Sequence, residues 1–269
     1  MKKLLFLLVC TLLLLTASAA PAAAVTFGQA DNGAHPNVGL VVVGYWEDGT
    51  YVRSFMGSGT LVAPGVFLTA GHVADAITSY DMDFLGVSFE ERLADVNESN
   101  LLTGTMILHP NYRWGTYDKC DLAVVLLDPD DTAGIVPAQL PTAGLLDTMK
   151  ANKQLRRQTF TCVGYGLTER THEAPGPPVF GGYDDVRRRY VTSGFFSLTP
   201  AWLHMSQNPA LGDGGSSYGD SGGPNFLGTS NVVVAVTSWG DVPCRALAIN
   251  YRLDTPSARG FLGDYMPLR

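Results

Sequence analysis

The sequence predicts an all-β fold, and three observations support this. Short apolar runs recur along the chain, and Gly, Pro, Asn and Asp separate them, as is typical of strands joined by turns. No long stretch shows the apolar spacing of a helix before residue 255. The runs lie at 38–43, 59–62, 66–70, 106–108, 122–127, 159–163, 232–237 and 246–252.

One short helix is expected near the end of the chain. Thr255 is a capping residue, and Pro256 suits the first helical position. The apolar residues that would face the core are Ala258, Phe261 and Leu262. We therefore predict a terminal helix that begins after Thr255.

The first 24 residues have the pattern of a secretory signal peptide. Lys2 and Lys3 precede an apolar run at 4–15, and a small-residue stretch with two cleavage candidates, 17–19 and 22–24, follows it. The apolar run is shorter than the roughly 20 residues that span a bilayer. We expect this segment (1–24) to be removed, and the mature protein to be secreted, extracellular and free of the membrane.

The charge of the chain argues against a nucleic-acid partner. The formal net charge is −7, and losing two lysines with the signal peptide would make it −9. Nucleic-acid binding normally needs clustered Lys and Arg. The dense basic run at 187–189 is offset by Asp184 and Asp185, so we expect it to be a solvated edge. No Cys-x-x-Cys or Cys/His cluster occurs, so neither a metal nor another cofactor is expected.

The cysteines leave their pairing open. Cys10 lies in the expected signal peptide, so Cys120, Cys162 and Cys244 remain. Three thiols cannot all pair within one chain, and export permits a disulfide without requiring one. A chain of this length can bury enough apolar surface to fold without crosslinks.

Three separate motifs supply a hydroxyl, an imidazole and a carboxylate. Gly-Asp-Ser-Gly-Gly-Pro at 219–224 places Ser221 on a glycine-bounded bend, where backbone N–H groups can converge. Leu-Thr-Ala-Gly-His-Val ends one residue after His72, and Asp-Leu-Ala-Val-Val begins with Asp121. A serine alcohol is a weak nucleophile until an oriented base activates it. His72 or Asp121 alone would more often be an ordinary strand-end or turn residue, and Ser221 alone would be as often ordinary as catalytic. The set of three predicts nucleophilic catalysis.

In their order of histidine, aspartate and serine, these motifs resemble the chymotrypsin/trypsin-like family of serine peptidases, of bacterial secreted type. Ser238-Trp239-Gly240 is similar to the segment along which that family pairs the substrate backbone, and 251–255 to its last strand and exit into the terminal helix. The resemblance implies two packed six-stranded antiparallel β-barrels with a short C-terminal helix, and catalysis in the cleft between them.

Residues 128–144 divide the predicted strands into two groups and are the candidate crossover between barrels. We expect an N-terminal barrel over 25–135 that carries the histidine and aspartate. A C-terminal barrel over 136–269 would carry the nucleophile and the terminal helix.

The resemblance also implies a role for each catalytic residue. Ser221 Oγ would attack the scissile carbonyl, while His72 takes its proton and later donates it to the leaving amine. Asp121 would hold the imidazole in the useful tautomer. The amides of Gly219 and Ser221 would form the oxyanion hole.

Asp220 has an expected partner at the start of the mature chain. In the family that the motifs resemble, the aspartate at this position pairs with the α-amino group that cleavage exposes at the start of the mature chain. Cleavage after Ala24 would expose Val25, followed by a stretch similar to the mature start of the family. Signal peptidase could then generate the active terminus directly, and a capping role for Asp220 is the alternative.

The substrate pocket is expected to be open and uncharged. By resemblance its base lies six residues before the nucleophile, at Gly215, where trypsin-like members carry an acid. Gly215, Ser216 and Gly240 favour apolar or aromatic side chains before the cut, although Asp213 and Asp241 lie nearby in sequence.

One disulfide of the family is missing from the sequence. Ser217 stands where the family often has a cysteine, and Cys244 lies at roughly the position of its partner. The bridge that would brace the pocket is therefore expected to be absent.

The sequence thus predicts a secreted serine endopeptidase, expected to be a monomer, that acts on polypeptides. Two alternatives stay open. One is a binding protein that has kept the fold without activity. The other is an esterase, because 219–223 also fits Gly-x-Ser-x-Gly.

Overall fold

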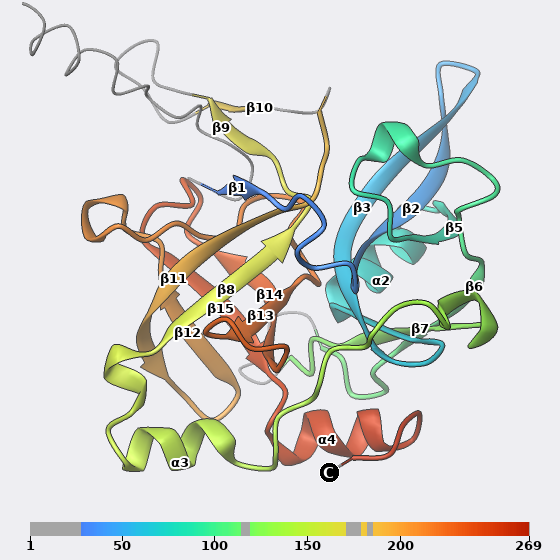
Figure 1. The fold of residues 1–269 in the computed structure, drawn as a ribbon. Helices are drawn as coiled ribbons and strands as arrows, with labels where there is room; N and C mark the ends of the chain where they lie inside the picture. Colours follow the sequence, from blue (N-terminus) through green and yellow to red (C-terminus); the bar gives the residue numbers. More distant parts are fainter. Residues whose placement is uncertain (1–27, 114–118, 171–178, 182–184, 269) are drawn as a thin grey trace, which may run out of the picture.

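The computed structural model describes residues 28–113, 119–170, 179–181 and 185–268. The expected signal peptide and Val25 lie outside the described residues. The described chain forms two antiparallel sheets, a short two-stranded ribbon and three short helices. Figure 1 shows the first sheet on the right and the second on the left. The all-β prediction and the prediction of two six-stranded units are confirmed.

The first sheet has six strands in the order β5-β2-β3-β4-β7-β6. This sheet curls but does not close into a barrel. Between its outermost strands, β5 and β6, the described residues show one isolated bridge, from Val87 of β5 to Leu102, a residue just before β6. Its strands are β2 (Val38–Glu47), β3 (Thr50–Ala63), β4 (Val66–Thr69), β5 (Asp83–Ser88), β6 (Gly104–Leu108) and β7 (Ala123–Leu127).

The second sheet closes into a barrel. Six strands follow in the order β11-β12-β15-β14-β13-β8, and β8 pairs back onto β11 from Arg189↔Gly164 to Gly194↔Thr159. The strands are β8 (Thr159–Gly164), β11 (Arg189–Leu198), β12 (Trp202–Ser206), β13 (Pro224–Leu227), β14 (Val233–Gly240) and β15 (Leu247–Arg252). β1 (Gln29–Ala30) adds to the outside of β11, and the separate ribbon consists of β9 (Thr168–Arg170) and β10 (Val179–Gly181).

The helices are α2 (Gly71–Ser79), α3 (Leu145–Ala151) and α4 (Pro256–Gly263). The predicted start of α4 is confirmed, because the Thr255 side chain accepts a hydrogen bond from the amide of Ala258. The expectation of no helix before residue 255 was wrong for α2 and α3. Both are under ten residues long, and such short segments carry too few apolar repeats to reveal a helical period.

Two buried apolar clusters hold the sheets. One fills the closed barrel, where alternate residues of β8 and β12 such as Phe160, Cys162, Leu203 and Met205 point inward. The other extends from the first sheet to the second and includes Phe261 of α4. α4 therefore packs under both sheets, as Figure 1 shows at the base of the molecule.

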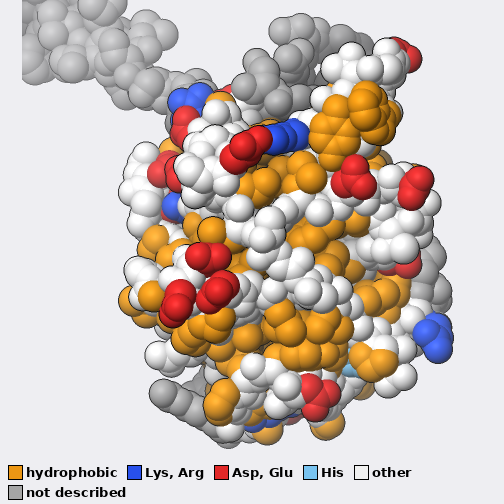
Figure 2. All heavy atoms as spheres, turned by 90° about the vertical axis from the view of Figure 1, so that its right-hand side faces the viewer, with side chains coloured by type: hydrophobic (Ala, Val, Ile, Leu, Met, Phe, Trp, Pro, Cys, Tyr) orange, Lys and Arg blue, Asp and Glu red, His pale blue; other side chains and the backbone are white. Residues whose placement is uncertain are grey.

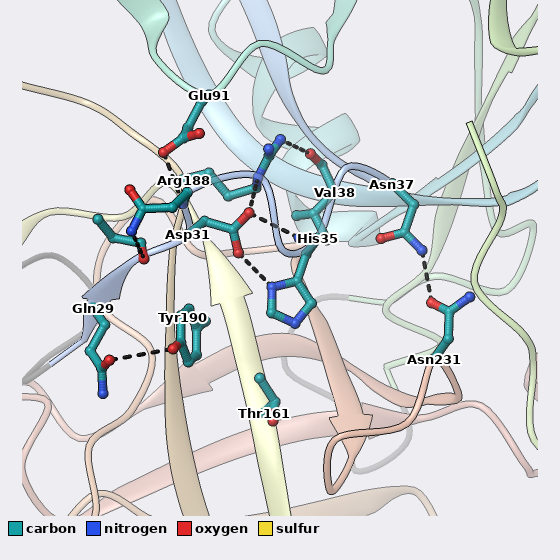
Figure 3. A network of polar contacts seen from close by, with 12 residues as sticks. Gln29, Asp31, His35, Asn37, Val38, Glu91, Thr161, Arg188, Tyr190 and Asn231 are labelled. Carbon is teal, nitrogen blue, oxygen red and sulfur yellow. Dashed lines mark hydrogen bonds and ion pairs between the residues drawn. The ribbon is translucent and has the colours of Figure 1, made fainter. Parts of the chain in front are cut away.

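A buried polar network joins the N-terminal segment to both sheets (Figure 3). Arg188, only 3% exposed, donates to Asp31 Oδ2 at 2.8 Å and to the Val38 carbonyl at 2.9 Å. Asp31 also accepts from the amide of His35 at 3.0 Å. The expectation that 187–189 is a solvated edge was therefore wrong for Arg188 and Arg189, which are both buried. Arg188 neutralises the buried Asp31 carboxylate.

Acidic side chains are spread over the face of the first sheet shown in Figure 2. The basic side chains on the described part of that face stand apart from one another and form no continuous patch. This distribution agrees with the acidic composition of the chain.

Candidate active site

The first turn of α2 joins His72 to Asp121. Asp121 lies just before β7, and its Oδ1 accepts a hydrogen bond from the backbone amide of His72 at 2.8 Å. The Nδ1 atom of the same residue lies 3.0 Å from Asp121 Oδ2. One carboxylate thus binds both an N-terminal amide of the helix and the ring. It fixes the position and the rotation of the imidazole.

Ser238 is the third partner of this carboxylate. Its hydroxyl donates to Asp121 Oδ2 in a short hydrogen bond. The pairing of β14 with β15 shifts register between Thr237 and Trp239, so a local bulge falls at Ser238. A bulge re-aims the side chain it carries. The expected substrate-binding residue therefore uses its side chain to hold Asp121.

These contacts decide the ionisation of Asp121, which is 1% exposed. Burial alone would raise its pKa. The charge and the hydrogen bonds of His72, together with the bond from Ser238, outweigh that effect and hold the pKa of Asp121 below its usual value. The carboxyl group is therefore an anion at neutral pH beside the imidazole.

Two glycines shape the loop that carries Ser221. Gly219 and Gly222 both have positive φ, at 97° and 86°. A β-carbon at Gly222 would overlap Thr69 Oγ1 and the Ser58 carbonyl oxygen. Only glycine combines this backbone conformation with so close an approach to β3 and β4.

The serine loop lies where the two sheets meet. The Ser221 carbonyl accepts from the amide of Ser58 in β3 at 2.8 Å, and the Gly222 amide donates to Thr237 of β14 at 2.9 Å. A β-carbon placed on Gly57 would lie 2.9 Å from both Ser221 O and a Val73 methyl. The backbone of Ser221 is thus next to the residue that follows His72.

The predicted oxyanion-hole amides have no hydrogen-bond partner within the described part of the chain. Among the described residues, neither the Gly219 amide nor the Ser221 amide donates a hydrogen bond. The Gly219 carbonyl is held from the other side, because it accepts from Ser58 Oγ at 3.0 Å. This contact fixes the peptide at Gly219, and both amides stay available to a ligand.

Asp220 is buried without a cation in hydrogen-bond contact among the described residues. Its carboxylate accepts from the amides of Gly166 at 2.8 Å and Ser217 at 2.7 Å. Burial raises the pKa of Asp220 to about 7, although the two amides and the charge of Arg189 act in the opposite direction. The expected pairing with Val25 falls on a residue outside the described part.

The segment from Trp239 to Gly240 has one edge without a described partner strand. On its other edge Trp239 pairs with Ile249 and Gly240 with Ala248. The β13 strand pairs with β14 only as far as Val236, and the loop after Ser221 bonds Thr237. An edge of this kind can add an extended peptide as a further strand.

Gln207, which follows β12, is a residue that the sequence analysis missed. It is fully buried, and a β-carbon placed on Gly215 would overlap the end of its side chain. The space beside Gly215 was expected to be open, and this amide fills it instead. A polar residue after a strand gives no signal of such a role, because Gln207 is eight residues from Gly215 in sequence and meets it only through the fold.

The three described cysteines form no disulfide with one another. All three are buried, and burial raises the pKa of the Cys162 thiol to about 12. Cys244 lies near the Val242 carbonyl, and Ser217 stays a buried serine. The predicted absence of a bridge between positions 217 and 244 agrees with these contacts.

Fold and site together define a class of protein: a closed antiparallel barrel packed against a curled six-stranded antiparallel sheet, with a histidine–aspartate pair at their junction beside a glycine-bounded serine loop. A family model described as Trypsin matches residues 30–252. The chain belongs to the trypsin family, whose members are serine proteases that act on polypeptides.

Solved structures agree on the fold. HL collagenase matches with a TM-score of 0.57 and 16% identity, over 86% of this chain and 94% of that one. At this identity the likeness concerns the fold alone. No curated protein matches the chain.

None of the helices in the described ranges is long and apolar enough to span a bilayer. Within the same ranges, no group of three or more His, Cys, Asp or Glu residues is arranged to hold a metal ion.

Proposed function

We propose that the chain is a secreted serine endopeptidase that hydrolyses peptide bonds through Ser221, His72 and Asp121. The observation that carries this proposal is the doubly hydrogen-bonded pair of His72 and Asp121 beside the backbone of Ser221. Membership of the trypsin family supports the same chemistry.

The proposed reaction has two halves. Ser221 Oγ attacks the substrate carbonyl carbon and gives its proton to His72, and the carbonyl oxygen becomes an oxyanion held by the amides of Gly219 and Ser221. His72 then protonates the leaving amine, which leaves an acyl-enzyme. Water, deprotonated by the same imidazole, hydrolyses the ester and restores Ser221. Asp121 stabilises the imidazolium in both halves.

The mature chain is proposed to begin at Val25 and to pair its α-ammonium with Asp220. Asp220 lies two strand spacings from Ala30. Ala30 pairs with Arg189, which pairs in turn with Gly164. A β-carbon placed on Gly164 would overlap Asp220 Oδ1. Two strand spacings amount to about 10 Å. Five residues can extend for about 17 Å, so the segment from Val25 to Ala30 is long enough to reach Asp220.

We further propose that the substrate side chain before the cut is neutral, apolar or aromatic. Gly215, Ser216 and Gly240 contribute no charge where a trypsin-like enzyme holds a carboxylate. Trp239 and Gly240 would pair the substrate backbone on their unpaired edge. Polypeptides are the proposed partners, and the enzyme is proposed to act outside the cell as a monomer.

The esterase and the inactive homologue predict different surroundings for Ser221. An esterase with a Gly-x-Ser-x-Gly elbow places its serine between a strand and a helix, with the acid and histidine later in sequence. Here a strand, β13, follows the loop, and both His72 and Asp121 precede Ser221. An inactive homologue would be expected to have lost one of the three residues, and His72, Asp121 and Ser221 are all present here.

Casein digestion by the mature chain, compared with Ser221→Ala, tests the proposal. We expect proteolysis that falls by about 10⁶-fold in the variant. Hydrolysis of simple esters without casein cleavage would indicate the esterase instead. A folded wild-type protein with neither activity would indicate the binding homologue.

A further inference from the structure

A positive charge lies over the ring of Trp239, at the edge where the proposed function places the substrate. The ammonium nitrogen of Lys119 is 5.2 Å from the centre of the indole ring. At this distance the cation is attracted to the face of the ring. Trp239 is 49% exposed, and Gly240 beside it is exposed as well. A ligand that reaches this edge from solvent therefore meets the cation.

A second cation stands next to Lys119. The carbonyl of Lys119 accepts a hydrogen bond from the amide of Arg113 at 3.1 Å, so these two residues lie side by side. Arg113 is exposed, and Lys119 is partly exposed. The chain as a whole carries a net charge of −7, so two adjacent cations reverse the sign of the charge locally.

The acid that follows Gly240 is held on the opposite edge of β14. The carboxylate of Asp241 accepts from the amides of Arg245, Ala246 and Leu247 at 2.6 to 3.0 Å. Leu247 begins β15, the strand that pairs with the other edge of this segment. Three amides thus surround this carboxylate on the side away from the unpaired edge.

The position of Ser221 gives the register of a bound substrate. The loop that follows Ser221 bonds both backbone groups of Thr237, each at 2.9 Å. The substrate residue before the cut therefore lies level with Ser238, and the second residue before the cut lies opposite Trp239. Residues opposite each other on neighbouring strands share a face, with their β-carbons about 5 Å apart. Side chains alternate between faces, so the fourth residue before the cut also lies on the Trp239 face, and the third does not.

We propose that Lys119 is a specificity-determining residue of this peptidase, and that it selects polypeptides with Asp or Glu at the second or fourth residue before the cut. The inference rests on the proposed function, because it assigns the substrate class of the same site. A carboxylate on the Trp239 face would lie beside the ammonium group of Lys119. Exposed ion pairs are weak, so the expected effect is a preference of a few-fold and not a requirement.

The test uses peptides of one sequence that carry Glu, Gln or Lys at the second, third or fourth residue before the cut. At low ionic strength, wild-type kcat/KM should be about 2- to 5-fold higher for Glu than for Gln at the second residue. The preference should be smaller at the fourth residue and absent at the third, which serves as the internal control. Salt at about 1 M should remove it, because the screening length falls to about 3 Å.

Two substitutions of Lys119 test its part in this preference. Lys119→Met should bring the Glu/Gln ratio at the second residue to about one. Lys119→Glu should reverse the order of the Glu and Lys peptides, a gain that a loss of folding cannot imitate. Lys153→Glu, at an exposed lysine that follows α3, is the matched control and should leave both ratios unchanged.

Equal rates for Glu and Gln at the second residue in the wild type would overturn the inference. So would a folded Lys119→Met that keeps the wild-type ratio. If casein is cut but the peptides are not, the same comparison is made on the cleavage sites mapped in casein for the wild type and Lys119→Glu. A wild type that cleaves neither the peptides nor casein would instead contradict the proposed function.

Discussion

At the scale of single residues, the site depends on how many groups share one carboxylate. Asp121 binds the amide and ring of His72 and the hydroxyl of Ser238. The amide bond lies at the N-terminus of α2, where an anion is favoured by the helix dipole. The same contacts that keep Asp121 charged therefore also fix where the imidazole can lie.

Substitutions at this carboxylate should give a graded loss of activity. Asp121→Asn should lower kcat by about 10⁴-fold, because an amide no longer selects the useful tautomer of His72. Ser238→Ala should lower it by only about tenfold, because two contacts to His72 remain. Asp130→Asn, at an exposed position, is the control for steady-state assays. A larger loss from Ser238→Ala than from Asp121→Asn would contradict this ordering.

Asp220 gives a prediction in which stability depends on pH. The folded-state pKa of about 7 lies above the value of about 3.9 expected in the unfolded chain. The folded protein therefore binds more protons between those values, and the contribution of Asp220 to stability declines as pH rises from about 4 to about 7.

This effect is measured by urea unfolding at pH 4.5 and 7.5, with Asp220→Asn as the reference. In a chain that carries extra residues before Val25, the free energy of unfolding should fall by about 2–4 kcal/mol relative to the reference as pH rises. In a chain that begins at Val25 the fall should be smaller, because the α-ammonium supplies a cation. Identical pH dependence of the wild type and Asp220→Asn in the extended chain would contradict the assignment.

The sequence predicts the residues of the candidate site more readily than the contacts among them. His72, Asp121 and Ser221 were predicted from motifs, since each stands in a short stretch of distinctive neighbours. The contact of Ser238 with Asp121 and the place of Gln207 depend on a bulge and on packing between distant segments. Neither leaves a local pattern.

At the scale of elements, glycines determine whether the serine loop can fit between the sheets. Gly222 combines positive φ with contacts to β3 and β4 that leave no room for a β-carbon. Backbone conformation and packing therefore require the same residue.

Gly222→Ala should lower the free energy of unfolding by about 3 kcal/mol or more, because overlap adds to backbone strain. Gly134→Ala is the matched control, since nothing lies within 4 Å of its added β-carbon and its φ is not in the left-handed range. It should change stability by less than about 0.5 kcal/mol. Thermal or urea unfolding compares the two. Equal effects would show that the loop is not confined as described.

Strand prediction succeeded where buried apolar runs were uninterrupted. All of the runs chosen from the sequence lie within or overlap observed strands, as with 159–163 and β8 (Thr159–Gly164). β5, β11, β12 and β13 lie outside the chosen runs. β11 contains Arg189, Thr192 and Gly194, so its apolar pattern is broken, although cross-strand pairing on both sides makes it a central strand. Tertiary context there overrides local propensity.

At the scale of the whole molecule, the candidate active site depends on two sheets keeping one relative position. The Arg188–Asp31 pair and the contact of Arg188 with the Val38 carbonyl connect β11 to the start of β2. Burial alone would raise the pKa of Asp31, but hydrogen bonds from His35 and Arg188 and the charge of His35 lower it. The ionised Asp31 therefore stabilises the folded protein above about pH 4, and this contribution is lost as the pH falls through the lowered pKa of Asp31.

Removing the Arg188–Asp31 ion pair should lower the stability of the folded protein. Arg188→Met leaves Asp31 as a buried carboxylate without its guanidinium, so the free energy of unfolding at pH 7 should fall by about 3–5 kcal/mol. Arg53→Met breaks an exposed pair with Glu98 and should cost less than about 1 kcal/mol. Urea unfolding of both variants gives the comparison. An Arg188→Met protein as stable as the wild type would contradict the role of the network.

The central claim is that His72 activates Ser221 at the junction of the sheets. Peptide mapping after treatment with a fluorophosphonate tests it most directly, because the reagent marks only an activated nucleophile. We predict one adduct, on Ser221, formed at least about 10³-fold more slowly in a folded His72→Ala variant. An adduct on another residue, or equal labelling of Ser221 without the imidazole, would contradict it.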